Sequence, residues 1–107
     1  MHPGGASYNS KVVLNDEAGY LKSLDGLRAL LDAHDFKDVK INCYRATAGR
    51  TDFTHLVVLN SPSRERRAAM MDAISSEAWA QEWIASAGTY CTVVTNGTYS
   101  EITPSHD

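Results

Sequence analysis

Hydrophobic and polar residues recur with two different periods along the chain, and these periods predict the order of its strands and helices. The most apolar segment is 53–59, which is rich in β-branched and large apolar residues and therefore predicts a strand covered on both faces. Residues 60–63 contain an asparagine, two serines and a proline, so we expect them to end this strand and to cap a following helix. The other elements are expected to pack around the strand.

Two segments have helical periodicity. Residues 17–33 follow an N-cap candidate at Asp16, and their apolar residues recur at the spacing of an amphipathic helix. That apolar stripe consists of Tyr20, Leu24, Leu27 and Leu31. Residues 63–86 are also expected to be helical, but the polar sequence at 75–77 interrupts their stripe and offers a new cap. We therefore predict a bend or two short helices at that sequence, with Gly88 as the stop.

Two further segments alternate as strands do. Residues 8–14 are the first strand candidate, and residues 39–46 alternate clearly between apolar and polar side chains. In the second of these segments, one face is expected to carry Val39, Ile41 and Cys43, and the other Lys40, Asn42 and Tyr44. The short glycine-containing sequence 47–51 then leads back into the strand at 53–59, which predicts an antiparallel hairpin.

The last strand candidate is 90–95. Asn96-Gly97 follows it and is a frequent turn sequence, so we interpret this pair as a tight turn or a bulge, after which residues 98–102 continue as strand. Together with the threonine that follows, the pair also matches an N-glycosylation acceptor. This short pattern is common by chance, and we prefer the turn.

The predicted order of strand, helix, strand, strand, helix and strand is that of the βαββαβ ferredoxin-like α+β fold. Its four-stranded antiparallel sheet has the first and third strands at the centre and helices on one face. The apolar segment 53–59 is the third strand and the half-polar segment 39–46 falls at an edge, so the polarity of both agrees with this topology. We predict a single domain over residues 8–102, a flexible arm at 1–7 and a tail at 103–107.

Length, charge and cysteines narrow the class of protein. A chain of 107 residues with 43% hydrophobic residues forms one core, and domains of this size often gain further burial by dimerising. The net charge of −3 provides no basic surface for nucleic acid, and no segment has the length of a membrane span. No signal peptide is visible, which favours a soluble cytoplasmic protein; a removed signal would instead indicate a secreted or periplasmic one. Cys43 and Cys91 do not form a paired motif, so two free thiols are expected, with a disulfide as the open alternative.

Three short motifs add a resemblance to a known family. They are residues 16–20, which open the first helix, residues 54–58, which lead into Pro62-Ser63, and residues 75–79 late in the second helical segment. With these motifs the chain resembles the dimeric α+β barrel superfamily over residues 8–102. This superfamily includes antibiotic-biosynthesis monooxygenase-like and stress-responsive barrel domains, and several small bacterial proteins of unknown function resemble it in the same way.

The resemblance implies a homodimer in which the open face of each sheet packs against the sheet of its partner. It also implies a pocket between each sheet and its own helices, where members of the superfamily bind haem, quinones or polyketides. The monooxygenases among them use an Asn, a Trp and either an Arg or a His, and this set has no definite match here. We therefore expect a small apolar or aromatic ligand and no cofactor. A cofactor-free or haem-dependent monooxygenase and a protein-interaction module are the alternatives.

His55 is the first candidate for a residue of this pocket, with catalysis as one of its hypothesised roles. It lies within the apolar strand, on the face expected to carry Phe53, Val57 and Leu59. A histidine there can act as a general base, a haem ligand or a polar anchor, whereas a hydrogen-bonded core or interface histidine is the simpler interpretation. The four histidines of the chain are too scattered to indicate a zinc site; they are His2, His34, His55 and His106.

Four other side chains are candidates for ligand contact. Trp79 and Trp83 lie one helical turn apart and can form an aromatic wall for a flat ligand, or can cover a core or an interface instead. Asn42 and Tyr44 share the polar face of their strand and can line a polar part of the cavity, although a half-exposed edge strand explains them equally well.

Overall fold

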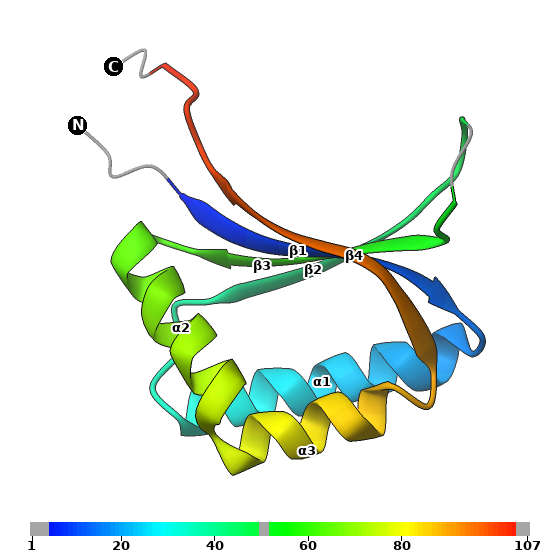
Figure 1. Cartoon of the computed structure of the whole chain (residues 1–107), viewed down its shortest axis with the longest axis horizontal. Helices are drawn as coiled ribbons and strands as arrows, with labels where there is room; N and C mark the ends of the chain where they lie inside the picture. The colour runs from blue at the N-terminus through cyan, green and yellow to red at the C-terminus, as the bar shows by residue number, and fades with distance from the viewer. Residues whose placement is uncertain (1–4, 50–51, 105–107) are drawn as a thin grey trace.

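The computed structural model describes residues 5–49 and 52–104, and this part of the chain forms four strands and three helices (Figure 1). In chain order they are β1 (Ala6–Leu14), α1 (Glu17–Ala33), β2 (Lys40–Arg45), β3 (His55–Ser61), α2 (Arg64–Ser76), α3 (Ala78–Ala87) and β4 (Cys91–Ser100). The strands form one antiparallel sheet in the order β2-β3-β1-β4, and all three helices lie on one face of it. The predicted ferredoxin-like α+β fold is therefore confirmed, with the first and third strands at the centre.

The helices begin at the predicted caps. The carboxylate of Asp16 accepts a hydrogen bond from the N–H of Gly19 at 3.0 Å, and the hydroxyl of Ser63 accepts one from the N–H of Arg66 at 3.2 Å. Each bond satisfies a backbone donor that the first helical turn cannot pair internally. Glu77 separates α2 from α3, so the predicted interruption of the second helical segment is confirmed.

The central strand β3 is displaced by two residues from the predicted segment. It begins at His55 and extends to Ser61, because Ser61 pairs with Ala6 at the start of β1. Phe53 precedes the strand, and its ring centre lies 5.3 Å from the ammonium group of Lys11. Lys11 pairs with Leu56, so it lies on the face of the sheet opposite to that of His55. The prediction that Phe53 shares a face with His55 is therefore wrong.

The last strand, β4, does not turn at Asn96-Gly97 as predicted. It pairs with β1 along its whole length, and the register shifts by one residue between Lys11 and Val12, which makes Val94 the additional residue of a β-bulge. The glycine fits within the strand because the ring of Tyr99 covers it, 3.4 Å from where a Cβ atom would lie. The turn prediction is wrong, and the bulge lies earlier in the strand.

The two ends of the described chain lie side by side (Figure 1). β1 begins two residues before the predicted start, and the N–H of Glu101 donates to the carbonyl of Gly5 at 2.7 Å. Residues 1–4 of the predicted arm and residues 105–107 of the predicted tail lie outside the described residues, as do residues 50–51 of the predicted hairpin turn.

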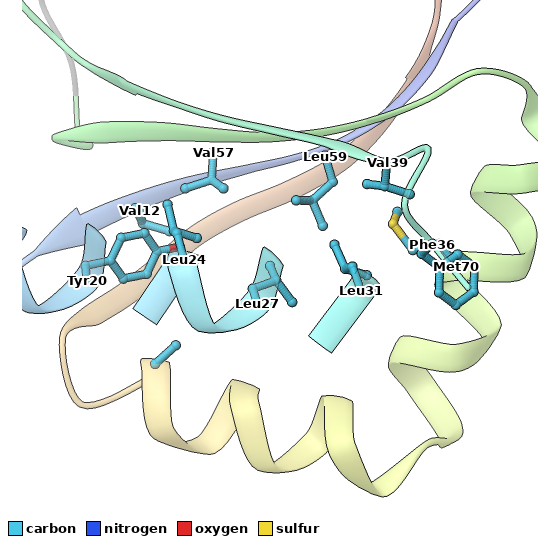
Figure 2. Packing of buried hydrophobic residues seen from close by; sticks show 11 residues of the cluster. Val12, Tyr20, Leu24, Leu27, Leu31, Phe36, Val39, Val57, Leu59 and Met70 are labelled. Atoms are coloured by element: carbon cyan, nitrogen blue, oxygen red, sulfur yellow. The ribbon is translucent and has the colours of Figure 1, made fainter. Parts of the chain in front are cut away.

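The hydrophobic core lies between the sheet and α1, as Figure 2 shows. The predicted apolar stripe of α1 is buried and consists of Tyr20, Leu24, Leu27 and Leu31. It faces Val12, Val57 and Leu59, which point from the sheet toward the helix. Met70 and Phe36 close the core at the far end of α1. Burial of one leucine contributes roughly 1.5–3 kcal/mol, so this layer holds α1 firmly against the sheet.

The strand register divides the sheet between a face covered by the helices and an open face. His55 lies on the covered face, which the sequence did not specify. The predicted alternation of β2 is confirmed: Ile41 and Cys43 share the covered face, and Asn42 and Tyr44 lie on the open face.

The two cysteines lie at opposite edges of the sheet. Cys43 is in β2 and Cys91 is in β4, with β3 and β1 between them. Three strand spacings of about 4.8 Å separate the two residues by roughly 14 Å, whereas a disulfide requires Cα atoms within about 7 Å. Both thiols are free, and the expectation of two free thiols is confirmed.

Candidate functional site

A cavity of about 300 Å³ lies between the sheet and the helices. Its floor is the covered face of β1, β3 and β4, and its walls come from α1, the end of α2 and α3. Most of its lining is apolar. Leu27 and Val57, which line it, also belong to the core between α1 and the sheet (Figure 2), so the cavity continues the core toward α3.

The cavity reaches the surface between α3 and the edge strand β4. Two of the residues that line it, Ile84 on α3 and Val93 on β4, are themselves 44% and 51% exposed. Large apolar side chains that contact both the cavity and solvent mark a mouth that an apolar molecule can enter. Within the described chain, no further strand pairs with the outer edge of β4.

Both predicted tryptophans line the cavity from α3. The indole N–H of Trp83 donates to the carbonyl of Ser23 on α1 at 2.7 Å, which ties the two helices together and fixes the orientation of the ring. The ring of Trp79 stacks on that of His34, with the ring centres 4.3 Å apart and the planes inclined by 7°. The helical spacing of the two tryptophans therefore does bring them to one wall.

The polar groups of the cavity are few and uncharged. Ser10 of β1 and Asn96 of β4 lie opposite each other, and the serine hydroxyl donates to Oδ1 of the asparagine at 2.7 Å. Tyr8 and Tyr20 add two phenol groups. Burial raises the pKa of Tyr20 well above its usual range, so its hydroxyl stays protonated and can donate a hydrogen bond. No Asp, Glu, Lys, Arg or His side chain of the described residues lines the cavity.

His55 lies outside this lining, in a separate polar cluster at the start of β3. It is only 7% exposed. Its Nε2 donates to Oε2 of Glu17 at 2.6 Å, and its Nδ1 lies 2.7 Å from the hydroxyl oxygen of Thr54. Arg45 of β2 donates from Nε to the same carboxylate oxygen at 2.8 Å, and from a terminal nitrogen to the other oxygen. Every polar atom of the imidazole ring therefore has a partner.

An ion pair between Glu17 and Arg45 lies at the centre of this cluster. The hydrogen bond from the Arg45 guanidinium, followed by that from His55, lowers the pKa of Glu17 to about 2. Glu17 also lies in the first turn of α1, where the helix dipole favours a carboxylate. The ionised carboxylate thus joins α1 to β2 and β3, and the geometry agrees with the simpler interpretation of His55 as a hydrogen-bonded core histidine.

The remaining predicted site residues lie apart from the cavity. Asn42 and Tyr44 are on the open face of β2, across the sheet from the cavity, and Tyr44 is 55% exposed. Sequence reasoning missed Ser10 and Asn96, which are 86 residues apart and meet only through the pairing of β1 with β4. The available signal is a serine at a covered position of an alternating strand, where a polar side chain needs a partner.

Residues 5–49 and 52–104 contain no group of three or more His, Cys, Asp or Glu side chains that could hold a metal ion. In the same ranges, no helix combines the length and the apolar character needed to cross a lipid bilayer. An apolar cavity with a few converging polar groups is the usual form of a small-molecule site, so the cavity is the candidate site.

Comparison with known proteins adds information about the fold. The amino-acid sequence matches no protein-family model, and no curated protein gives a significant match. Solved structures of low sequence identity are similar. A NIPSNAP family protein of unknown function from Agrobacterium tumefaciens is 13% identical, with a TM-score of 0.62 over 97% of this chain and 95% of that chain.

Two further solved structures have a similar TM-score to this chain. SnoaB from Streptomyces nogalater, a cofactor-independent oxygenase, is 6% identical, with a TM-score of 0.58 over 97% of this chain and 99% of that chain. A dimeric ferredoxin-like protein from an uncultured marine organism is 7% identical, with a TM-score of 0.59 over 95% of this chain and 99% of that chain. Identities this low establish a shared fold alone. The chain shares the ferredoxin-like α+β fold of these structures, which is the fold that the resemblance implied.

Proposed function

We propose that the protein is a homodimer that binds a small, uncharged, mostly apolar or aromatic molecule in the cavity beside α3. The cavity itself carries this proposal. It measures about 300 Å³, is lined by two tryptophans, opens between α3 and β4, and has no charged side chain in the lining formed by the described residues. This volume lies at the lower end of the range of small-molecule pockets.

The apolar lining of the cavity favours the binding of a ligand. The cavity opens between α3 and β4, so its apolar lining is in contact with solvent when no ligand is bound. Removing this apolar surface from water favours binding by about 25 cal/mol per Å². Water would fill the space poorly because the lining offers few polar partners. An apolar molecule would restore most of the missing contacts.

The lining also defines the class of molecule. A charged group inside the cavity would lose its hydration without gaining a charged partner, which costs several kcal/mol. Trp79 and Trp83 offer two large aromatic surfaces, which favour a flat molecule that packs against them. An uncharged aromatic or polycyclic compound suits these surfaces best.

A second copy of the chain is the proposed cover of the open sheet face. This face combines the partly buried apolar residues Leu56 and Val58 with the exposed residues Asn42 and Tyr44. One protein of similar fold is described as dimeric. In the proposed dimer, Asn42 and Tyr44 contact the partner chain rather than the ligand.

A cofactor-free monooxygenase is the second candidate function, favoured by the similarity of the fold to that of SnoaB, a cofactor-independent oxygenase. The groups near the cavity support binding better than proton abstraction. Tyr20 stays protonated because burial raises its pKa, and His55 is held by Glu17 and Thr54 outside the lining. Neither residue is therefore placed to act as a base on a molecule in the cavity.

The residues fit a haem poorly. His55, the candidate axial ligand, uses both ring nitrogens in hydrogen bonds and does not line the cavity. A haem is larger than most drug-sized ligands, whereas the cavity lies at the lower end of the range for such ligands. If the protein is instead an interaction module, a different partner chain would cover the open face and the cavity would bind nothing.

Native mass spectrometry with and without added 9-fluorenone, a flat and uncharged aromatic ketone, tests the proposal. The wild-type protein should be detected as a dimer that retains either a co-purified molecule or one fluorenone per chain. Ala80→Phe should remain a dimer but retain neither, because Ala80 is buried in the lining and a phenylalanine there fills the cavity. Ala78→Phe, at an exposed position of α3, is the matched control and should behave as the wild type.

Three outcomes would contradict parts of the proposal. A monomer at micromolar concentration would contradict the dimer. A dimer that retains nothing, and whose melting temperature does not change with fluorenone, would contradict ligand binding and favour the interaction module. Fluorenone that is retained by Ala80→Phe as well as by the wild type would bind outside the cavity.

A further inference from the structure

One polar pair interrupts the apolar lining near the mouth of the cavity. Ser10 of β1 and Asn96 of β4 pair in the sheet, and Val93, which is half exposed, lines the cavity from the same strand as Asn96. Asn96 is also exposed, so its side chain is accessible from both the cavity and the solvent. A molecule that enters between α3 and β4 therefore passes this pair.

The β-bulge at Val94 is what brings Asn96 to the cavity. Side chains of a regular strand alternate between faces, so residues three apart lie on opposite faces. Val93 and Asn96 nevertheless both line the cavity, because the bulge absorbs one residue between them. In a regular strand that continued from Val93, Thr95 would face the cavity and Asn96 would face away. The irregularity of β4 thus determines which side chain occupies this position.

The hydrogen bond from Ser10 leaves the amide nitrogen of Asn96 available. The serine hydroxyl donates to Oδ1 at 2.7 Å, and Nδ2, which carries two N–H donors, makes no hydrogen bond with the described part of the chain. Such a donor discriminates between ligands. A ligand without an acceptor would exclude solvent from Nδ2 and offer no hydrogen bond in exchange, whereas a ligand with an acceptor would form one.

We infer that this pair selects ligands that carry a hydrogen-bond acceptor, such as the carbonyl oxygen of a ketone, ester or amide, on an otherwise flat and uncharged body. The carbonyl accepts from Nδ2 of Asn96, and Ser10 is a positioning residue that fixes the orientation of the amide. This inference rests on the proposed function, because it names the ligand class of the same cavity.

Two matched molecules test the inference, since 9-fluorenone and fluorene have the same three rings and differ in the ketone oxygen. Calorimetric titration should show that the wild-type protein binds fluorenone about fivefold more tightly than fluorene, the factor expected for one net hydrogen bond. Asn96→Leu should lower this ratio to about one, and Ser10→Ala should lower it partly. Thr98→Leu, on the same face of β4 but outside the lining, should keep the wild-type ratio.

A second variant at the same position tests whether the loss of selectivity comes from the lost donor or from a change of structure. Asn96→Asp has nearly the same shape and replaces the N–H donors with a carboxylate oxygen, so it should bind fluorenone less tightly than fluorene. Circular dichroism and melting temperature establish that each variant is folded.

The outcomes distinguish this inference from the proposed function. Equal affinity of the wild-type protein for the two molecules would overturn selection by Asn96 while leaving ligand binding intact. Failure of both molecules to bind would overturn the binding function and the inference with it. A fivefold ratio that persists in both Asn96 variants would assign the ketone contact to another residue and overturn the inference.

Discussion

The polar cluster around His55 and the cavity beside α3 lie on the same face of one sheet, yet their polar groups are in opposite situations. In the cluster, Glu17 and Thr54 occupy both ring nitrogens of His55, and Arg45 completes the carboxylate. In the cavity, Nδ2 of Asn96 has no partner in the described chain. The comparison teaches that a buried ionisable side chain with complete partners has no group left for a ligand. Nδ2 of Asn96, at the exposed mouth of the cavity, has two donors that the described chain does not use.

The difference has a physical origin in the elements that surround each region. The cluster forms where the start of α1 meets β2 and β3, so ionisable side chains from three elements converge there. The cavity lies where small residues of α3 and its C-cap face the sheet. Ala80 and Ala87 of α3 and Gly88 after it line the cavity, and Trp79 and Trp83 border the space that they leave.

The largest expected effect is on the free energy of unfolding, from a substitution in the polar cluster. His55→Ala should lower the free energy of unfolding by roughly 2–3 kcal/mol, because it removes a buried ring and leaves Thr54 and Glu17 with fewer partners. The affinity for fluorenone should not change, since His55 does not line the cavity. Urea unfolding and calorimetric titration measure the two quantities.

The effect of His55→Ala is compared with that of a substitution at an exposed position. Lys22→Ala removes an exposed side chain of α1 and should change the free energy of unfolding by less than about 0.5 kcal/mol. If His55→Ala kept its stability but lost affinity for fluorenone, His55 would be a ligand-contacting residue and the comparison between the two regions would be reversed.

A smaller effect concerns the pH dependence of stability. Folding lowers the pKa of Glu17 from 4.5 to about 2, so its ionised form stabilises the fold above about pH 4.5, and this contribution is lost as the pH falls toward 2. Glu17→Gln removes the contribution. The difference in free energy of unfolding between the wild type and Glu17→Gln should therefore shrink as the pH falls through this range. Urea unfolding at several pH values measures it, and a difference independent of pH would show that the ion pair does not form.

The smallest effect lies outside both regions. Gly26 is exposed on α1, and a Cβ atom added there would meet no atom within 4 Å. Gly26→Ala should raise the free energy of unfolding by about 0.5–1 kcal/mol through its higher helix propensity, without changing the affinity for fluorenone. Urea unfolding and titration test whether stability alone alters binding. Loss of stability would instead reveal a contact on that side of α1, such as one with a partner chain.

The fold was predictable because most of its signals are local. The stripe of α1 recurs within one helix, and the alternation of β2 lies within six residues. The predictions that were wrong concern segments whose structure depends on pairing between strands far apart in the sequence. Asn96-Gly97 usually turns, but its pairing with β1 and the cover provided by Tyr99 keep it in β4. Ser61 extends β3 because Ala6 pairs with it.

The candidate site was predictable only in part. Trp79 and Trp83 were identifiable because one helical turn places them on the same side. His55 stood out as a histidine in an apolar strand, but its partner Glu17 lies 38 residues away, so the sequence could not reveal that its hydrogen bonds are complete. Asn96 reaches the cavity only through a bulge, which no local pattern indicates.

The bulge at Val94 makes the lining of the cavity depend on the number of residues in β4 as well as on their identity. A slip of the strand by one residue would turn Thr95 toward the cavity and Asn96 away from it, with every other residue unchanged. Loss of Val94 itself would instead make β4 regular and leave Asn96 opposite Ser10. The pairing of this edge strand with β1, and not its sequence alone, therefore decides which side chain meets a ligand.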